Sequence, residues 1–297
     1  IEVATSSRTY DVHIACELLP RVGEIARSTA GGSRAMVVSN TDVAPLYSDT
    51  VLASLRDAGY DVHIHVVESS ETVKNMAELA RLLEHCAEAE LTRDDVVVAL
   101  GGGVVGDLAG FAAATYMRGC KLVQVPTSLL AMVDSSVGGK TAVDLVHGKN
   151  LAGAFFQPRA VVASVEALDT IAPTLFADSC GEVIKYGVMC DPDLFASLEK
   201  TPLTESRDDH ERLGSVIARC VEIKRDVVSN DECERGLRQT LNLGHTIGHA
   251  VESANEYRLG HGSSVAAGMC IMARACAKRG WCDGETARRI EAVVAAH

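Results

Sequence analysis

The sequence has few aromatic residues and no close cysteine pairs. Aromatic residues make up 4% of the 297 positions, and no two of the ten cysteines form a C-x-x-C pair. No apolar run reaches the ~18–20 residues of a membrane-spanning helix, and no secretory signal opens the chain. These absences argue against disulfide-stapled, membrane and secreted proteins. We therefore expect a cytoplasmic protein whose cysteines are reduced thiols used as small core residues.

Positive charge is also scarce. The chain has 28 Lys and Arg against 40 Asp and Glu, which gives a formal net charge of −12. A surface that binds nucleic acid needs clustered Lys and Arg to neutralise phosphates, so this balance argues against a nucleic-acid partner. It leaves room for one local basic pocket for a small anionic substrate. The remaining composition, with 47% hydrophobic and 23% charged residues, is that of an ordinary globular protein.

The first part of the chain has the pattern of an α/β domain. Short runs rich in β-branched residues alternate with segments that carry apolar residues at helical spacing. The runs are Tyr10–Ile14, Arg34–Ser39, Asp61–Val67, Asp95–Leu100, Lys121–Val125 and Ala160–Ser164. This alternation predicts a mostly parallel sheet with helices on its faces, a variant of the Rossmann arrangement.

From about Pro173 onward the pattern is helical. The predicted helices are Gly181–Met189, Asp193–Glu199, Glu211–Val228, Arg235–Asn255, Ser263–Arg279 and Glu285–Ala296. They predict an all-α C-terminal domain. We place the boundary after Thr170, which gives an α/β domain at residues 1–170 and a helical domain at residues 171–297.

A glycine-rich segment, Gly101–Gly110, follows the apolar run Val96–Leu100. Gly101, Gly103 and Gly106 fit the G-x-G-x-x-G pattern, whose glycines let a pyrophosphate approach a helix N-terminus. In an ordinary Rossmann domain this pattern follows the first strand, and the next strand supplies an acidic residue for the ribose. Neither condition holds here. The segment is either a dinucleotide site in a variant frame or a closely packed strand-to-helix turn.

Two lysines lie between glycines further along the chain. Gly139–Thr141 looks like the tail of a Walker A loop, but Asp134 stands where the complete pattern needs glycine, and the preceding segment is helical. We therefore reject an ATPase P-loop. Lys140 and Lys149 either recognise phosphate or carboxylate oxygens or are solvated surface lysines.

Histidines and a glutamate in the helical part form a candidate metal site. His245 and His249 are four residues apart and would share one helix face. Glu182 stands at the start of a predicted helix, and His261 lies in a Gly-His-Gly turn. Two His and one Glu would make a three-ligand Zn²⁺ site with open positions. Spacing does not choose between His245 and His249, and histidines buried in the core are the alternative.

Five segments together resemble the 3-dehydroquinate synthase family. They are Gly101–Ala113, Val125–Thr141, Gly148–Pro158, Gly181–Gly187 and Leu241–Ala250. The resemblance implies a lyase of the shikimate pathway that converts 3-deoxy-D-arabino-heptulosonate 7-phosphate into 3-dehydroquinate and phosphate. The implied steps are transient oxidation by NAD, phosphate elimination, re-reduction and intramolecular aldol closure. The implied cofactors are NAD, bound in residues 1–170, and Zn²⁺, with Co²⁺ as an alternative metal, bound in residues 171–297.

The resemblance also implies roles for individual residues. The metal ligands would be Glu182, His245 and His261. Cofactor contacts would be Asn40, Asp42, Ser69, Glu71, Lys74, Gly103, Val104, Val105, Gly106, Asp107, Thr127, Ser128, Lys140, Lys149, Leu168 and Thr170. Catalytic and substrate contacts would be Asp134, Lys140, Lys149, Asn150, Lys185, Lys224, Arg238, Asn242 and His249. Arg118 would reach the substrate phosphate across a dimer interface, which implies a homodimer.

Several alternatives accompany this interpretation. Sister sugar phosphate cyclases make 2-deoxy-scyllo-inosose, 2-epi-5-epi-valiolone or aminodehydroquinate with the same cofactors, but Gly148–Pro158 and Arg238 favour a substrate with a carboxylate. A metal-dependent polyol dehydrogenase would produce net NADH, and a non-catalytic binding protein would turn nothing over. Family members continue beyond the position of His297 with a substrate-binding lysine motif. We therefore expect either a C-terminally truncated chain or an active site that lacks one wall.

Overall fold

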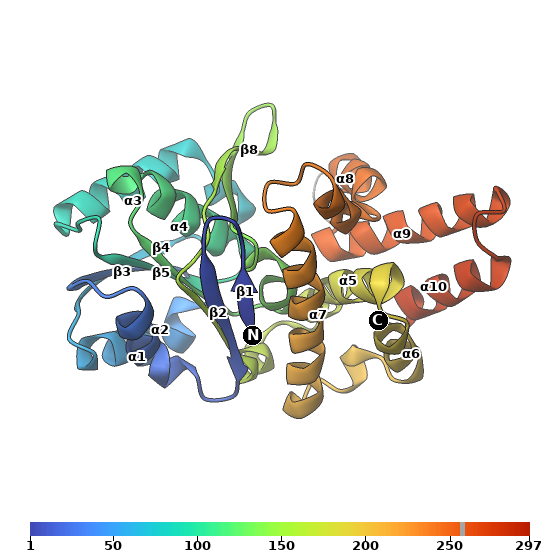
Figure 1. Cartoon of the computed structure of the whole chain (residues 1–297), viewed down its shortest axis with the longest axis horizontal. Coiled ribbons are helices and arrows are strands. Elements are labelled where there is room, and N and C mark those ends of the chain that lie inside the picture. The colour runs from blue at the N-terminus through green and yellow to red at the C-terminus, as the bar shows by residue number, and fades with distance from the viewer. Residues whose placement is uncertain (256–258) are drawn as a thin grey trace. The chain divides into compact units, whose positions relative to one another are not determined.

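The computed structural model of the chain describes residues 1–255 and 259–297. The chain divides into two compact units, a first unit of Ile1–Glu166 and a second unit of Ala167–His297 (Figure 1). None of the helices among the described residues is long and apolar enough to cross a membrane. Five of the ten cysteines are buried, as expected for small core residues, and the other five are partly or fully exposed.

A seven-stranded sheet forms the centre of the first unit. Its strands lie in the order β1 (Glu2–Ala4), β2 (Thr9–Ala15), β9 (Ala160–Ser164), β6 (Lys121–Pro126), β5 (Val96–Gly101), β3 (Arg34–Asn40) and β4 (Asp61–Val67). Within residues 1–166, β1 pairs with β2 in antiparallel fashion, and the other pairs of this sheet are parallel. All six strands predicted from the sequence are present, so the predicted mostly parallel α/β domain is confirmed.

Helices cover both faces of this sheet. Helices α1 (Val22–Thr29) and α2 (Ala44–Asp57) cover one face, and α3 (Met76–Glu88) and α4 (Gly103–Thr115) cover the other. Successive side chains of a strand point to opposite faces. Val37 therefore packs with the first pair of helices and Met36 with the second. Because β5 and β9 are buried on both faces, their sequences are nearly continuous apolar runs.

The first unit also contains a hairpin that the sequence analysis missed. Strands β7 (Lys140–Leu145) and β8 (Gly148–Phe155) pair in antiparallel fashion as a separate sheet. Glycines and lysines hide its alternating pattern, and a register shift lies between Val143 and Leu145. Shorter helical turns lie at η1 (Leu19–Arg21), η2 (Glu71–Val73), η3 (Tyr116–Arg118) and the π-helical η4 (Ala131–Ser135), and η5 (Val165–Thr170) spans the boundary to the second unit.

The described residues of the second unit are helical, as predicted. The helices are α5 (Pro173–Cys190), α6 (Pro192–Lys200), α7 (His210–Asn230), α8 (His245–Ala254), α9 (His261–Lys278) and α10 (Gly284–Ala296), with short turns η6 (Leu203–Glu205) and η7 (Leu237–Asn242). Helix α9 packs against α5, α8 and α10. The buried side of α9 is rich in small residues, which lets these helices approach closely.

Three local predictions in the second unit were wrong. The segment 235–255, predicted as one helix, contains η7 and α8, because Gly244 between them has a left-handed backbone with φ +79°. Glu182 lies in the middle of α5 and not at its start, since Pro173 occupies a first-turn position. His261 is the first residue of α9, where the sequence suggested a turn.

Candidate active site

Predicted cofactor residues of the first unit follow the ends of neighbouring strands. Asn40 ends β3, Ser69 follows β4, Gly103 follows β5 and Thr127 follows β6. These four strands are parallel neighbours, so their carboxyl ends lie at one edge of the sheet, which we call the carboxyl edge. The strand order reverses between β3 and β5, since β4 lies on one side of β3 and β5 on the other. Open α/β sheets bind ligands at such a switch point.

The glycine-rich segment opens α4 at this switch point. Gly102 is the N-cap of α4 and Gly103 is its first residue. A Cβ added to Gly110 would lie 2.3 Å from the Thr141 Cγ2 atom, so close packing requires this glycine. A Cβ on Gly103 would meet only side-chain atoms, the nearest being the Ser135 hydroxyl at 3.2 Å. The later glycine therefore serves packing, whereas the first turn of α4 offers backbone N–H groups to a ligand.

Polar contacts fix the loops at the carboxyl edge. The Asn40 Oδ1 atom accepts hydrogen bonds from the backbone N–H groups of Asp42 (3.2 Å) and Val43 (2.9 Å). The Thr41 hydroxyl accepts one from the N–H group of Ser69 (3.1 Å). The ends of β3 and β4 are thereby joined. Thr127 is buried and donates its N–H to the Gly101 carbonyl (3.1 Å), which joins the ends of β6 and β5.

Lys74 is a buried lysine at the centre of a polar network. Its ammonium donates to the Asp107 carboxylate (2.9 Å) and to the Asn150 side-chain oxygen (2.6 Å), and the side chain is 5% exposed. Glu71 lies 3.8 Å from this ammonium and 3.5 Å from that of Lys149. Residues predicted to bind cofactor and residues predicted to bind substrate are thus brought together.

Burial and charge shift two pKa values in this network. Burial raises the pKa of Asp107 to about 6, and the neighbouring Lys74 ammonium opposes this shift. Burial alone would lower the pKa of Lys74, but Asp107, Glu71 and Asp144 outweigh it and raise that pKa. Lys74 is therefore held as a cation.

One member of the network, Asp144, was not predicted from the sequence. Its carboxylate accepts a hydrogen bond from the N–H group of Asn150 (2.7 Å) and lies 3.8 Å from the Lys74 ammonium. Asn150 has a left-handed backbone with φ +58°, a conformation that costs energy for a residue other than glycine. The hydrogen bond to Asp144 helps to hold Asn150 in this conformation. The sequence feature that could have identified Asp144 is its place as an acidic residue shortly before the His147-Gly148 turn of the hairpin.

Other predicted residues of the first unit lie on its turns and hairpin. Asp134 belongs to η4, and Lys140 begins β7 with an exposed side chain. Ser128 accepts a hydrogen bond from the N–H group of Ala131 (3.3 Å). Arg118 is exposed, with φ +65°, in a turn whose neighbours also have positive φ.

In the second unit, Glu182, His245 and His261 form what we call the ligand group. The Glu182 Oε1 atom lies 3.4 Å from the Nε2 atom of each histidine, and Glu182 is fully buried on α5. Their donor atoms all lie within 4.8 Å of one another. Ligand atoms ~2.0–2.1 Å from a tetrahedral zinc ion lie about 3.4 Å apart. The residues therefore fit a zinc-sized ion.

The charges around the ligand group also favour a cation. Burial alone would lower the pKa of His261, but the Glu182 and Glu252 carboxylates raise it to about 10. Two buried carboxylates thus attract positive charge to this ring. The Lys185 ammonium contacts the second oxygen of Glu182, which leaves Oε1 facing the two histidines. A second group within reach, His249, Glu252 and His261, shares one histidine with the first.

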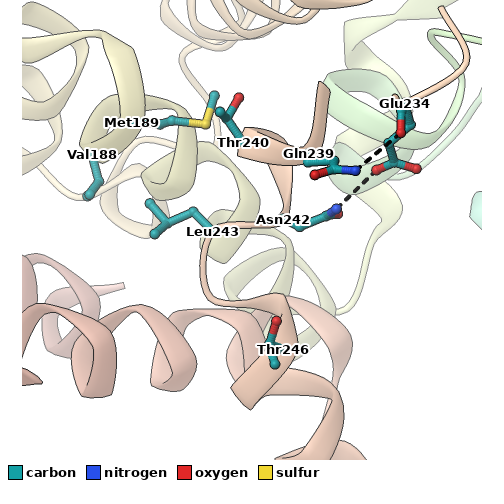
Figure 2. A pocket seen from close by; sticks show the side chains of 8 residues that line it. All are labelled: Val188, Met189, Glu234, Gln239, Thr240, Asn242, Leu243 and Thr246. Carbon is teal, nitrogen blue, oxygen red and sulfur yellow. Dashed lines mark hydrogen bonds between the residues drawn. The ribbon is translucent and has the colours of Figure 1, made fainter. Parts of the chain in front are cut away.

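The remaining predicted residues of the second unit occupy α7, η7 and η5. Lys224 and Arg238 are buried, and Arg238 donates to the Glu232 carbonyl (2.6 Å). Leu168 and Thr170 lie in η5. A pocket of about 820 Å³ is lined by Val188, Met189, Glu234, Gln239, Thr240, Asn242, Leu243 and Thr246. Figure 2 shows Asn242 and Gln239 directed toward Glu234, whose carboxylate accepts from Asn242 at 3.0 Å.

Comparison with known proteins identifies the family of this chain. Models of the 3-dehydroquinate synthase N-terminal and C-terminal domains match residues 64–178 and 179–297. A 3-dehydroquinate synthase of Citrifermentans bemidjiense is 46% identical over 297 residues, which cover 100% of this chain and 82% of that protein.

Solved structures of sister enzymes share the fold. A 2-deoxy-scyllo-inosose synthase complexed with carbaglucose-6-phosphate, NAD⁺ and Co²⁺ is 25% identical, with a TM-score of 0.92 over 100% of this chain and 80% of that one. A 2-epi-5-epi-valiolone synthase from Streptomyces hygroscopicus with NAD⁺ and Zn²⁺ is 26% identical, with a TM-score of 0.90 over 99% and 81%. Solved alcohol and glycerol dehydrogenases at 13–16% identity show the fold alone.

The fold is that of the sugar phosphate cyclases. Within that class the chain belongs to the 3-dehydroquinate synthase family, the phosphorus–oxygen lyases of the shikimate pathway. The resemblance noted in the sequence is thereby confirmed. The sister cyclases, at about 25% identity, are structural neighbours and stand further from this chain than the 3-dehydroquinate synthases at 41–46%.

Proposed function

We propose that this chain catalyses its family's reaction with NAD at the carboxyl edge and a divalent metal ion, Zn²⁺ or Co²⁺, in the ligand group. The observation that carries the proposal is the approach of two histidine nitrogens to one buried Glu182 oxygen, each at 3.4 Å. A bound metal supplies a Lewis acid that polarises substrate oxygens. NAD supplies a hydride acceptor that is regenerated in each turnover.

Lys74 orients groups of the first unit in this proposal. Its ammonium fixes the Asp107 carboxylate, at the first turns of α4, and the Asn150 amide, on the hairpin. Moving either group away from Lys74 would cost free energy, because a buried ammonium would lose one of its partners. The network therefore keeps cofactor-binding and substrate-binding side chains in one fixed arrangement, and orientation is a large part of the rate enhancement.

Buried cations of the second unit support an anionic substrate. Lys224 and Arg238 are 5% and 1% exposed, and a buried cation favours anionic neighbours because burial penalises its charge. We assign them to phosphate or carboxylate oxygens of the substrate, with Asn242 and His249 as further contacts. Lys185 holds Glu182 in place through its second oxygen.

The remaining assignments are part of the same proposal. Asp134, Lys140 and Lys149 contact the substrate, and Leu168 and Thr170 contact NAD. Arg118 reaches the substrate phosphate from the partner protomer of a homodimer. Its exposed side chain, on a turn with positive φ at three successive residues, supports a role that needs a projecting arginine.

One assay tests the reaction. Metal-loaded protein is incubated with 3-deoxy-D-arabino-heptulosonate 7-phosphate and catalytic NAD⁺, and phosphate and 3-dehydroquinate are measured together. We expect equal amounts of both products without net NADH. Net NADH would instead indicate a dehydrogenase. If the heptulosonate phosphate is not consumed, the protein is a sister cyclase that acts on another sugar phosphate or a non-catalytic protein. A protein that binds NAD but turns over no sugar phosphate would be the non-catalytic one.

A further inference from the structure

The His261 ring faces a different carboxylate at each of its two nitrogens. Its Nε2 atom lies 3.4 Å from Glu182, and its Nδ1 atom lies 3.5 Å from the Oε2 atom of Glu252. Glu252 belongs to α8 and is 3% exposed. A histidine that binds a metal is neutral, with one N–H group and one lone pair, and the hydrogen bond at one nitrogen decides which tautomer is present. A carboxylate at Nδ1 therefore directs the lone pair of Nε2 toward Glu182 and His245.

This geometry distinguishes the two groups that share His261. A carboxylate that accepts the outer N–H group of a ligating histidine orients the ring and raises its basicity. Glu252 has the position of such an acceptor. Glu182 has the position of a ligand, since one of its oxygens is equally distant from two histidine Nε2 atoms.

A second carboxylate holds the backbone that carries His261. Asp178 lies on α5 one turn before Glu182, so both side chains share a helix face. Its two oxygens accept hydrogen bonds from the N–H groups of Ser263 (2.8 Å) and Gly262 (3.3 Å), in the first turn of α9. The helix that supplies one ligand thus binds the first turn of the helix that supplies another.

The two helices touch directly at this point. A Cβ added to Gly181 would lie 2.1 Å from the Gly262 carbonyl oxygen, and one added to Gly262 would lie 1.8 Å from the Asp178 carbonyl oxygen. Only glycines permit such an approach of two backbones. The spacing of Glu182 and His261 is therefore set by main-chain contact and by Asp178.

We propose that Glu252 and Asp178 are positioning residues for the metal ligand His261, Glu252 through the ring and Asp178 through the backbone. This inference rests on the proposed metal site. Neither carboxylate is a metal ligand in this arrangement. Their effect is on how tightly the metal is held and on the orientation of one ligand.

The test measures metal affinity. Glu252→Gln and Asp178→Asn variants are titrated with Zn²⁺ against a chromophoric chelator, and their Co²⁺ forms are examined by visible spectroscopy. We expect each variant to bind Zn²⁺ about 10- to 100-fold more weakly. The Co²⁺ bands should keep their number and approximate intensity, since the ligands are unchanged.

Two matched variants control for loss of charge and of a helix cap. Glu285→Gln removes an exposed carboxylate that pairs with Arg288 (2.7 Å). Asp283 accepts a hydrogen bond from the N–H group of Thr286 (2.6 Å) in the first turn of α10, just as Asp178 accepts hydrogen bonds from the first turn of α9. Asp283→Asn weakens this cap. Both controls should bind Zn²⁺ as the unaltered chain does, although Asp283→Asn should lower the melting temperature.

Other outcomes would overturn the inference. Unchanged Zn²⁺ affinity in Glu252→Gln would show that Glu252 does not position His261. Complete loss of Zn²⁺ binding in both Glu252→Gln and His249→Ala would make Glu252 a metal ligand. If Asp178→Asn does not fold, Glu252→Gln decides alone. Loss of binding in His245→Ala with full binding in Glu252→Gln would leave the metal site standing and overturn only the positioning role. Full binding in His245→Ala would contradict the metal site itself.

Discussion

Lys74 and Asp107 form an ion pair, with the buried ammonium 2.9 Å from an oxygen of the partly buried carboxylate. The pair connects the segment after β4 with the helix that begins at the glycine-rich turn. Burial raises the pKa of Asp107 to about 6 despite this partner. Because the pKa of Asp107 differs from that of a free carboxyl, part of the free energy of unfolding of the first unit depends on pH.

Asp107→Asn should remove that pH dependence. A carboxyl with a raised pKa takes up a proton on folding, so its stabilising contribution is present below about pH 4 and is lost as the pH rises through about 6. The difference in free energy of unfolding between the original chain and the variant should fall by roughly 1–3 kcal/mol over this window. Urea unfolding of the cofactor-free proteins from pH 4 to 7 measures it.

An exposed aspartate gives the opposite sign and serves as control. Asp94 accepts a hydrogen bond from the Lys121 ammonium (2.8 Å), which lowers the pKa of Asp94. Its contribution should therefore grow as the pH rises toward about 4 and stay constant above this value. A difference that also grows with pH in Asp107→Asn would contradict the burial effect at that site.

Two glycine variants separate packing from ligand binding at the glycine-rich turn. In Gly110→Ala the new methyl would lie 2.3 Å from Thr141, so the free energy of unfolding should fall by about 1–3 kcal/mol. In Gly103→Ala the nearest neighbour of the methyl is the Ser135 hydroxyl at 3.2 Å, a side-chain atom that can move, so stability should fall less than in Gly110→Ala while the Kd for NAD⁺ rises about 10-fold. Thermal unfolding and NAD⁺ titration measure both. Unchanged NAD⁺ binding in Gly103→Ala would favour the interpretation of this turn as packing alone.

Gly262→Ala should disturb the ligand group from a distance. Its methyl would lie 1.8 Å from a backbone oxygen of Asp178, so α5 and α9 must move apart. We expect a loss of about 1–3 kcal/mol in stability together with weaker Zn²⁺ binding. Gly284→Ala is the matched control, since Gly284 also lies in the first turn of a helix and its Cβ would meet only an arginine side chain at 3.5 Å. Equal melting temperatures for both variants would argue against the backbone contact.

His245→Ala should abolish stoichiometric metal binding. One of the two nitrogens near Glu182 would be lost, and two ligands hold zinc poorly. His249→Ala, on the same face of α8, should retain the metal because His249 lies outside the ligand group. Metal content by mass spectrometry after dialysis measures both. Full zinc content in His245→Ala would refute the ligand assignment.

The sequence predicted the parts of this protein that depend on local pattern. Apolar runs such as Val96–Leu100 identify buried strands because such strands are covered on both faces. The i, i+4 spacing of His245 and His249 correctly placed them on one helix. It could not choose between them, because the choice depends on which nitrogen approaches Glu182, a residue distant in the chain. Asp144 and Asp178 were missed for the same reason, since their partners are set by the fold.

Local features explain two further errors. Gly244 stands within an amphipathic pattern that otherwise continues from 235 to 255, and only its positive φ reveals the break. The hairpin of β7 and β8 has exposed residues on both strands, so its period of two does not stand out.

The carboxyl edge has a consequence for the order in which a growing chain acquires its binding sites. This edge needs residues from Asn40 to Ser128, which belong to strands that pair only across long stretches of sequence. Domains generally fold as units during synthesis, the N-terminal one first. The last strand of the first unit is β9, which lies between β2 and β6, so we expect a nascent chain to become able to retain a nucleotide soon after β9 has left the ribosome. Capture of metal must wait for α9, about a hundred residues later.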